Sequence, residues 1–142
     1  MQHPQWVHRL TSRLATICLL ASAWWCTPAL AAAPDLRNLR LPPGFQIEVL
    51  TAAVPNARQM ALGAFKDGKG VLYVGSMGEG KVYAVEIDQG RAGAVHTIAS
   101  GLQMPVGVAW RDGQLFVSAV SKILRFDGID DRLRHPPAPV TV

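Results

Sequence analysis

The sequence contains an internal repeat, and this repeat constrains the fold more than any other feature. Gln59–Gly63 (Gln-Met-Ala-Leu-Gly) returns forty-four positions later as Gln103–Gly107 (Gln-Met-Pro-Val-Gly). An Asp-Gly pair, an apolar triplet and a lysine that opens an apolar run follow each copy in the same order. Because a period of ~40–50 residues built from short strands is typical of β-propeller blades, the repeat predicts an all-β fold of this kind.

The inner and outer strands of the predicted blades can be placed from the repeat and from hydrophobic alternation. Strict alternation over Phe45–Leu50 predicts an outer strand ahead of the first copy. Inner strands are expected over Gln59–Phe65 and Gln103–Trp110. Within them, Met60 and Met104 are expected to pack in the core.

Two Asp-Gly pairs predict tight hairpins. Asp67-Gly68 and Asp112-Gly113 lie between apolar runs, and a type I′ turn needs two residues that tolerate a positive φ. After Asp131 the pattern fades into a proline-rich tail. The remaining strands are predicted over residues 71–76, 81–87, 94–99, 114–119 and 122–127.

These elements amount to about two blades plus a donated outer strand. A propeller needs at least about four blades to close, and fewer than three stacked repeats are poorly stable. The strand over Phe45–Leu50 is expected to complete a last blade that the chain does not contain. We therefore expect residues 44–142 to be the truncated amino-terminal part of a propeller domain, preceded by a linker over residues 32–43.

The pattern of charge and hydrophobicity over residues 1–31 predicts a signal peptide for the general secretory route. Arg9 and Arg13 precede a long uncharged apolar run, and Ala29-Leu30-Ala31 offers a cleavage site after Ala31. An uncleaved membrane anchor is the alternative, but Pro28 shortens the apolar stretch below the roughly 18 residues that a span requires. We expect no stable membrane anchor and a periplasmic or secreted location.

Charge and cysteine content argue against a nucleic-acid-binding protein and against a fold that is stabilised by disulfides. The chain carries 14 basic and 10 acidic side chains, and Arg9 and Arg13 belong to the predicted signal. No basic stripe remains that would indicate a nucleic-acid partner. Cys18 and Cys26 also belong to the signal, so the exported part is expected to fold without disulfides.

The sequence supplies no recognisable catalytic or metal-binding constellation. His96 lies on a predicted outer strand and His135 lies in the proline-rich tail, and neither pairs with a nucleophile. The cluster Asp127, Asp130 and Asp131 lacks the spacing of a calcium loop and predicts a solvated turn. We therefore assign no catalytic residue and no metal ligand to this chain.

Gln59, Gln103 and Arg58 are the candidate ligand-binding residues. An amide at the entry of an inner strand would lie at the mouth of the central funnel, where propellers usually bind ligands. The alternative is that each amide only satisfies backbone groups of an adjacent loop. Both interpretations remain open at this point.

Five strings, in their order and spacing, resemble the opening blades of the PQQ-dependent glucose/sorbosone dehydrogenase family. The resemblance implies a six-bladed propeller that uses pyrroloquinoline quinone (PQQ) and calcium. It also implies oxidation of a sugar or aldose-type substrate in the periplasm, with hydride transfer to the quinone and an external electron acceptor. The strings are Leu41–Phe45, Ala57–Ala61, Gly80–Val85, Gly101–Pro105 and Lys122–Asp127.

The resemblance carries Gln103 over to a glutamine at the active-site mouth of the family. Gln59 and Arg58 are weaker candidates for the same cofactor site, because the family places glutamine and arginine side chains near the quinone. Val106 stands where many members have asparagine. The catalytic histidine and most cofactor and calcium ligands of the family come from later blades, beyond Val142.

Two other functions are compatible with the repeat. One is a propeller of the NHL type, which is a scaffold for protein contacts. The other is a calcium-dependent lactonase-like propeller, whose inner strands share a Pro-x-Gly-Val motif with Pro105–Val108. A histidine-containing inner strand in the next blade would distinguish the dehydrogenase from the scaffold.

Overall fold

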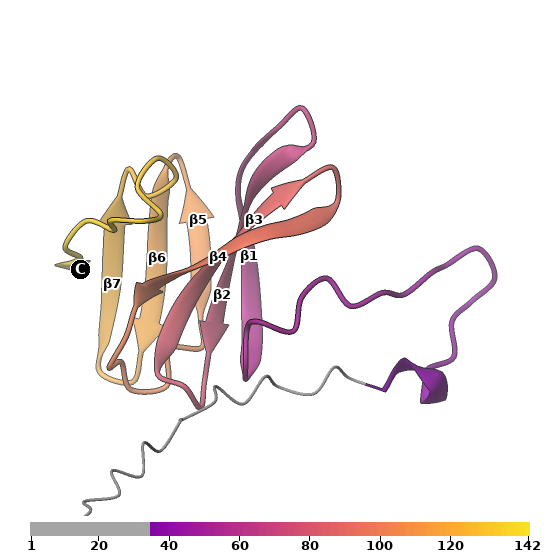
Figure 1. Ribbon diagram of the computed structural model, residues 1–142. Coiled ribbons are helices and arrows are strands. Elements are labelled where there is room, and N and C mark those ends of the chain that lie inside the picture. Colours follow the sequence, from indigo (N-terminus) through magenta and orange to yellow (C-terminus); the bar gives the residue numbers. More distant parts are fainter. Residues whose placement is uncertain (1–34) are drawn as a thin grey trace, which may run out of the picture.

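The computed structural model describes residues 35–142, and the predicted signal peptide (residues 1–31) lies outside this part of the chain. A short 3₁₀ helix, η1 (Leu36–Asn38), precedes eight strands that form two four-stranded antiparallel sheets (Figure 1). The all-β prediction is confirmed. The first sheet contains β1 (Ala57–Lys66), β2 (Lys69–Ser76), β3 (Lys81–Asp88) and β4 (Arg91–Ala99), and the second contains β5 (Val108–Arg111), β6 (Gln114–Ala119), β7 (Lys122–Asp127) and β8 (Val140–Thr141).

In each sheet the strands follow one another in chain order, so every neighbouring pair is joined without a crossover. The two predicted Asp-Gly hairpins are present, with φ values of 52° and 78° at Asp67 and Gly68 and of 49° and 77° at Asp112 and Gly113. These positive values are the ones that a type I′ turn requires.

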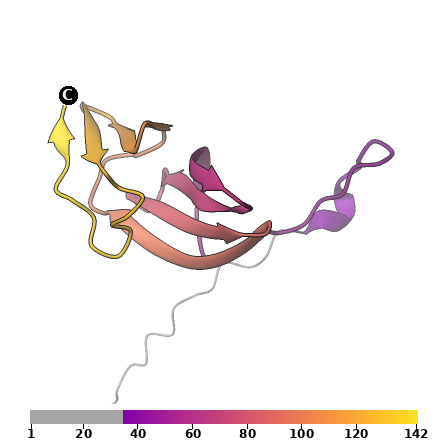
Figure 2. The same cartoon turned by 90° about the horizontal axis from the view of Figure 1, so that it is seen from above.

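The main hydrophobic core lies between the two sheets. Side chains alternate along β2 and β3, so that Tyr73 and Val82 face the second sheet while Val74 and Tyr83 face away from it. The second sheet contributes Leu115, Val117, Leu124 and Phe126 to the shared core. The strand β1 lies beside β5, as Figures 1 and 2 show.

Gly75 marks the closest approach of the two sheets. A Cβ atom added there would lie 2.5 Å from the carbonyl oxygen of Val106 and 2.6 Å from that of Pro105. These distances are shorter than real contacts of a Cβ atom. A glycine at this position therefore allows the segment before β5 to lie against β2.

The strand predicted over Phe45–Leu50 is not formed. The segment belongs to an extended arm that leads away from the sheets, and Phe45 is 69% exposed (Figure 1). A strand needs a hydrogen-bonding neighbour, and among residues 35–142 none pairs with this segment. The alternation alone does not make a strand here, because no strand among the described residues pairs with the segment.

The inner strand predicted from Gln103 starts only at Val108. Pro105 has no N–H group to donate to a ladder, and Met104 adopts a left-handed backbone with a φ of 47°. In the first copy, Ala61 occupies the position of Pro105, and β1 runs through it without interruption.

One further expectation was wrong. Met60 and Met104 are 61% and 53% exposed and do not pack in the core. Met60 lies on the face of the first sheet that is turned away from the second sheet, and Met104 lies in the irregular segment before β5. After the proline-rich tail, a further strand that the sequence did not predict, β8, pairs with β7 at the outer edge of the second sheet (Figure 2).

No helix within residues 35–142 is long and apolar enough to cross a membrane.

Candidate functional site

Gln103 lies in the irregular segment between β4 and β5. Its carbonyl oxygen accepts a 3.1 Å hydrogen bond from the N–H of Val120, in the turn between β6 and β7. Its side chain is exposed and makes no hydrogen bond to any residue in the described part of the chain. The backbone of Gln103 is thus anchored while its amide remains available to a ligand.

Gln103 lines a hollow of about 230 Å³. Its polar side chains are those of Gln103, Ser121 and Lys122. The lining contains one cationic side chain, Lys122, and no carboxylate. Lys122 forms no salt bridge within residues 35–142. The full lining is Gly101, Leu102, Gln103, Ala119, Ser121 and Lys122.

Gln59 has a different environment. It belongs to β1, where it is paired with Gly75, and its Nε2 donates a 3.3 Å hydrogen bond to the carbonyl oxygen of Val108 in β5. This contact connects the first sheet to the second. The structure therefore supports the backbone-satisfying interpretation for Gln59, and it does not place this amide in the hollow at Gln103.

Arg58, beside Gln59, is exposed on β1 and makes no hydrogen bond or salt bridge within the described residues. It does not line the hollow at Gln103 either. The three candidate ligand residues are consequently not gathered around one cavity.

Asp130 has a role that the sequence did not indicate. Its carboxylate accepts a 2.6 Å hydrogen bond from the hydroxyl of Tyr73 in β2 and a 3.0 Å bond from the indole N–H of Trp110 in β5. The aspartate cluster was predicted to be a solvated turn, and for Asp130 this prediction was wrong. No local spacing reveals the contact, because Tyr73 lies 57 residues away in the sequence.

The environment of Tyr73 changes its acidity. Burial raises the pKa of the Tyr73 hydroxyl, and the hydrogen bond to Asp130 and the negative charges of Asp130 and Asp131 raise it further. The hydroxyl is therefore a hydrogen-bond donor throughout the physiological pH range.

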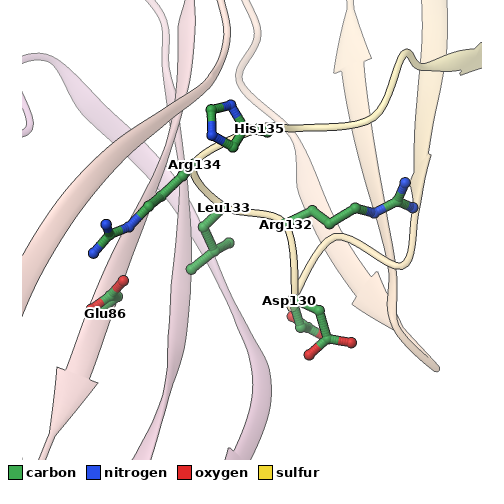
Figure 3. A pocket seen from close by; sticks show the side chains of 7 residues that line it. Glu86, Asp130, Arg132, Leu133, Arg134 and His135 are labelled. Atoms are coloured by element: carbon green, nitrogen blue, oxygen red, sulfur yellow. The ribbon is translucent and has the colours of Figure 1, made fainter.

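A second hollow, of about 350 Å³, lies between β3 and the loop after β7 (Figure 3). Figure 3 shows the side chain of Arg134 extending toward Glu86, with His135 above it at the upper end of the loop. The Nε2 atom of His96 lies 2.8 Å from the carboxylate of Glu86. The lining is Glu86, Asp130, Asp131, Arg132, Leu133, Arg134 and His135.

The two histidines are not placed for catalysis near Gln103. Neither His96 nor His135 lines the hollow that contains the glutamine. Within residues 35–142, no group of three or more His, Cys, Asp and Glu residues could hold a metal ion.

The fold defines an all-β protein made of two repeat-related, four-stranded antiparallel sheets. The chain is similar to an uncharacterized protein of Borreliella burgdorferi, with 29% identity over 119 residues. The matched region covers 84% of this chain and 28% of the relative, so the chain spans less than a third of that protein's length. No family model matches the chain, and no solved structure matches it.

Proposed function

We propose that this chain is the amino-terminal part of an exported β-propeller that oxidises a sugar or aldose-type substrate with PQQ as the hydride acceptor. The supporting observation is the exposure and the position of the Gln103 side chain. Its amide is exposed at the entry of the second repeat, beside an open hollow, at the position that corresponds to a glutamine of the quinoprotein family. In this proposal each sheet is one propeller blade.

The packing of the sheets supports the propeller part of the proposal. Blades stack face to face, and here the buried core lies between two four-stranded sheets. The longer Borreliella burgdorferi relative is consistent with further blades, because this chain covers only 28% of it. The arm over residues 45–50 then supplies an outer strand to the last blade, which closes the ring.

The described residues fit the cofactors only in part. Gln103 would offer an amide N–H to a polar group of the quinone, which acts as a two-electron hydride acceptor when it is bound. Calcium takes six to eight oxygen ligands, and within residues 35–142 the acidic side chains and histidines are not grouped to provide them. We assign none of these residues to calcium and derive no step through it.

A scaffold of the NHL type is the second candidate function. It is favoured by Gln59, which was a candidate ligand residue but instead fastens β1 to the carbonyl oxygen of Val108. In this alternative the repeat only builds blades, and partner proteins bind the rim.

The test uses the protein expressed from its full reading frame, reconstituted with PQQ and calcium. Dye reduction is measured with a panel of aldoses, for the wild type, Gln103→Ala and the control Asn38→Ala, which removes an exposed side-chain amide outside the segment 45–50. We expect Gln103→Ala to lower kcat/KM by roughly ten- to a hundred-fold, the loss of one hydrogen bond to a charged partner. Its Tm should stay within error of the control.

Two results would contradict the proposal. One is a folded protein that reduces no dye with any aldose in the presence of PQQ and calcium. The other is a Gln103→Ala variant that keeps full specific activity while its Tm falls, because the amide would then only support its loop.

A further inference from the structure

The hairpin turns at the same end of the two sheets differ in length and charge. In the first sheet, Ser76 of β2 pairs with Lys81 of β3, and four residues form the turn. In the second sheet, Ala119 of β6 pairs with Lys122 of β7, and only two residues form the turn. Both β3 and β7 therefore begin with a lysine, but the two lysines have different surroundings.

In the first sheet the turn contains a glutamate that pairs with the lysine at the start of β3. Glu79 lies two residues before Lys81, and its carboxylate lies 3.8 Å from the Lys81 ammonium. The same carboxylate accepts a 3.2 Å hydrogen bond from the side-chain amide of Asn56, which precedes β1. The charge of Lys81 is thus paired with an internal carboxylate.

In the second sheet this carboxylate is missing. The residue two positions before Lys122 is Val120, whose side chain is 67% exposed. Lys122 has no salt-bridge partner among residues 35–142. The hollow of about 230 Å³ lies beside this turn, and Lys122 and Gln103 both line it.

We propose that the hollow at Lys122 and Gln103 binds the carboxylate group of a small molecule. The ammonium of Lys122 supplies the charge, and the amide of Gln103 and the hydroxyl of Ser121 supply neutral donors. A ligand carboxylate would take the place that the Glu79 carboxylate has beside Lys81 in the first sheet. The inference deepens the proposed function, which assigns Gln103 to the same site, but the preference for an anion comes from Lys122 alone.

The volume limits the size of the bound group. A water molecule occupies about 30 Å³ in the liquid, so the hollow has room for a carboxylate with a few attached carbons. Two sources share this chemistry, namely a carboxylate of the quinone and the carboxylate of an acidic sugar.

The experiment titrates D-gluconate and neutral D-glucose, as a matched pair, into the isotopically labelled protein from the full reading frame. The amide signals of Gly101 and Ser121 report on the hollow by NMR. We expect gluconate to shift both signals, with an affinity that decreases as salt rises, and glucose to shift neither. Lys122→Gln should weaken gluconate binding about tenfold, while the matched control Lys81→Gln should leave it unchanged.

A competition arm with PQQ distinguishes the two sources. If PQQ displaces gluconate, the hollow holds a carboxylate of the cofactor, and if both bind together, it holds an acidic sugar. Equal shifts with glucose and gluconate, no shift with either anion, or equal effects of Lys122→Gln and Lys81→Gln would overturn the inference. Loss of sugar oxidation does not enter these readouts, so gluconate binding by a protein that oxidises no aldose would refute the proposed function and leave this inference standing.

Discussion

The hydroxyl of Tyr73 donates a 2.6 Å hydrogen bond to the carboxylate of Asp130, and this bond ties β2 of the first sheet to the loop that follows β7 of the second. Since Trp110 donates to the same carboxylate, one side chain joins three separate parts of the chain. The first prediction tests this link.

Tyr73→Phe should destabilise the protein by about 1 kcal/mol at neutral pH, the net contribution of one buried hydrogen bond. The ring still fills its place in the core, so the far-ultraviolet circular dichroism spectrum should not change. Urea unfolding measures the difference. A variant as stable as the wild type would show that the hydrogen bond from Tyr73 to Asp130 does not contribute to the free energy of unfolding.

The same residue should make stability depend on alkaline pH. The pKa of Tyr73 is raised in the folded protein, mainly by burial and then by Asp130, so the folded state keeps a proton that the unfolded state loses. Its contribution is complete below about pH 10, the ordinary tyrosine pKa, and decreases as the pH rises above that value. Urea unfolding at about pH 8 and about pH 11 should show a smaller alkaline loss for Tyr73→Phe than for the wild type. An equal loss in both proteins would assign the effect to other groups.

Gln59→Ala should lower stability without affecting ligand binding. The substitution removes the hydrogen bond from Nε2 to the carbonyl oxygen of Val108, which should cost about 1 kcal/mol. Thermal unfolding measures the loss, and gluconate titration checks the hollow at Gln103. If Gln59→Ala instead weakened gluconate or PQQ binding with no change in Tm, the assignment of Gln59 as a link between the sheets would be wrong.

Gly75→Ala should be strongly destabilising. The added methyl group would lie 2.5 Å from the carbonyl oxygen of Val106, and overpacking of this kind costs about 1–3 kcal/mol. Gly93→Ala is the matched control, because a Cβ atom there meets Glu86 only at an ordinary distance of 3.5 Å. We expect Gly93→Ala to unfold within a few degrees of the wild type. Similar melting curves for both variants would contradict the close approach of the sheets at Gly75.

The arm over residues 45–50 gives a test of ring closure. In the chain of residues 1–142 the segment 46–50 is paired with no strand among the described residues, so its backbone amides should exchange with deuterium within seconds. In the protein from the full reading frame, the same amides should be protected if the arm completes a last blade. Fast exchange in both proteins would contradict the propeller proposal.

Sequence reasoning succeeded where the signal is local. The positive φ values at Asp67-Gly68 and Asp112-Gly113 follow from residue type, and the apolar runs after them became β2 and β6. It failed where a distant partner decides the outcome. Phe45–Leu50 has the pattern of a strand but no neighbour among residues 35–142, and the two-residue β8 forms because β7 offers a free edge.

For the candidate site, too, local sequence identified residues but could not reveal their distant contacts. The repeat identified Gln59 and Gln103 as a pair, but it could not show that one amide reaches Val108 while the other lies in an open hollow. Lys122 was noted only as the start of a strand. Its importance became visible when its turn was compared with the turn around Glu79 and Lys81.

The proline at position 105 has a consequence for how the two halves of the chain can have diverged. The first copy of the repeat has Ala61 at this place, and its glutamine is held inside β1; the second has Pro105, and its glutamine lies ahead of β5. A single nucleotide change converts an alanine codon into a proline codon. In a chain that carries two copies of one segment, such a change in one copy removes a strand N–H there and leaves the other copy unaltered, so the two glutamines can serve different purposes.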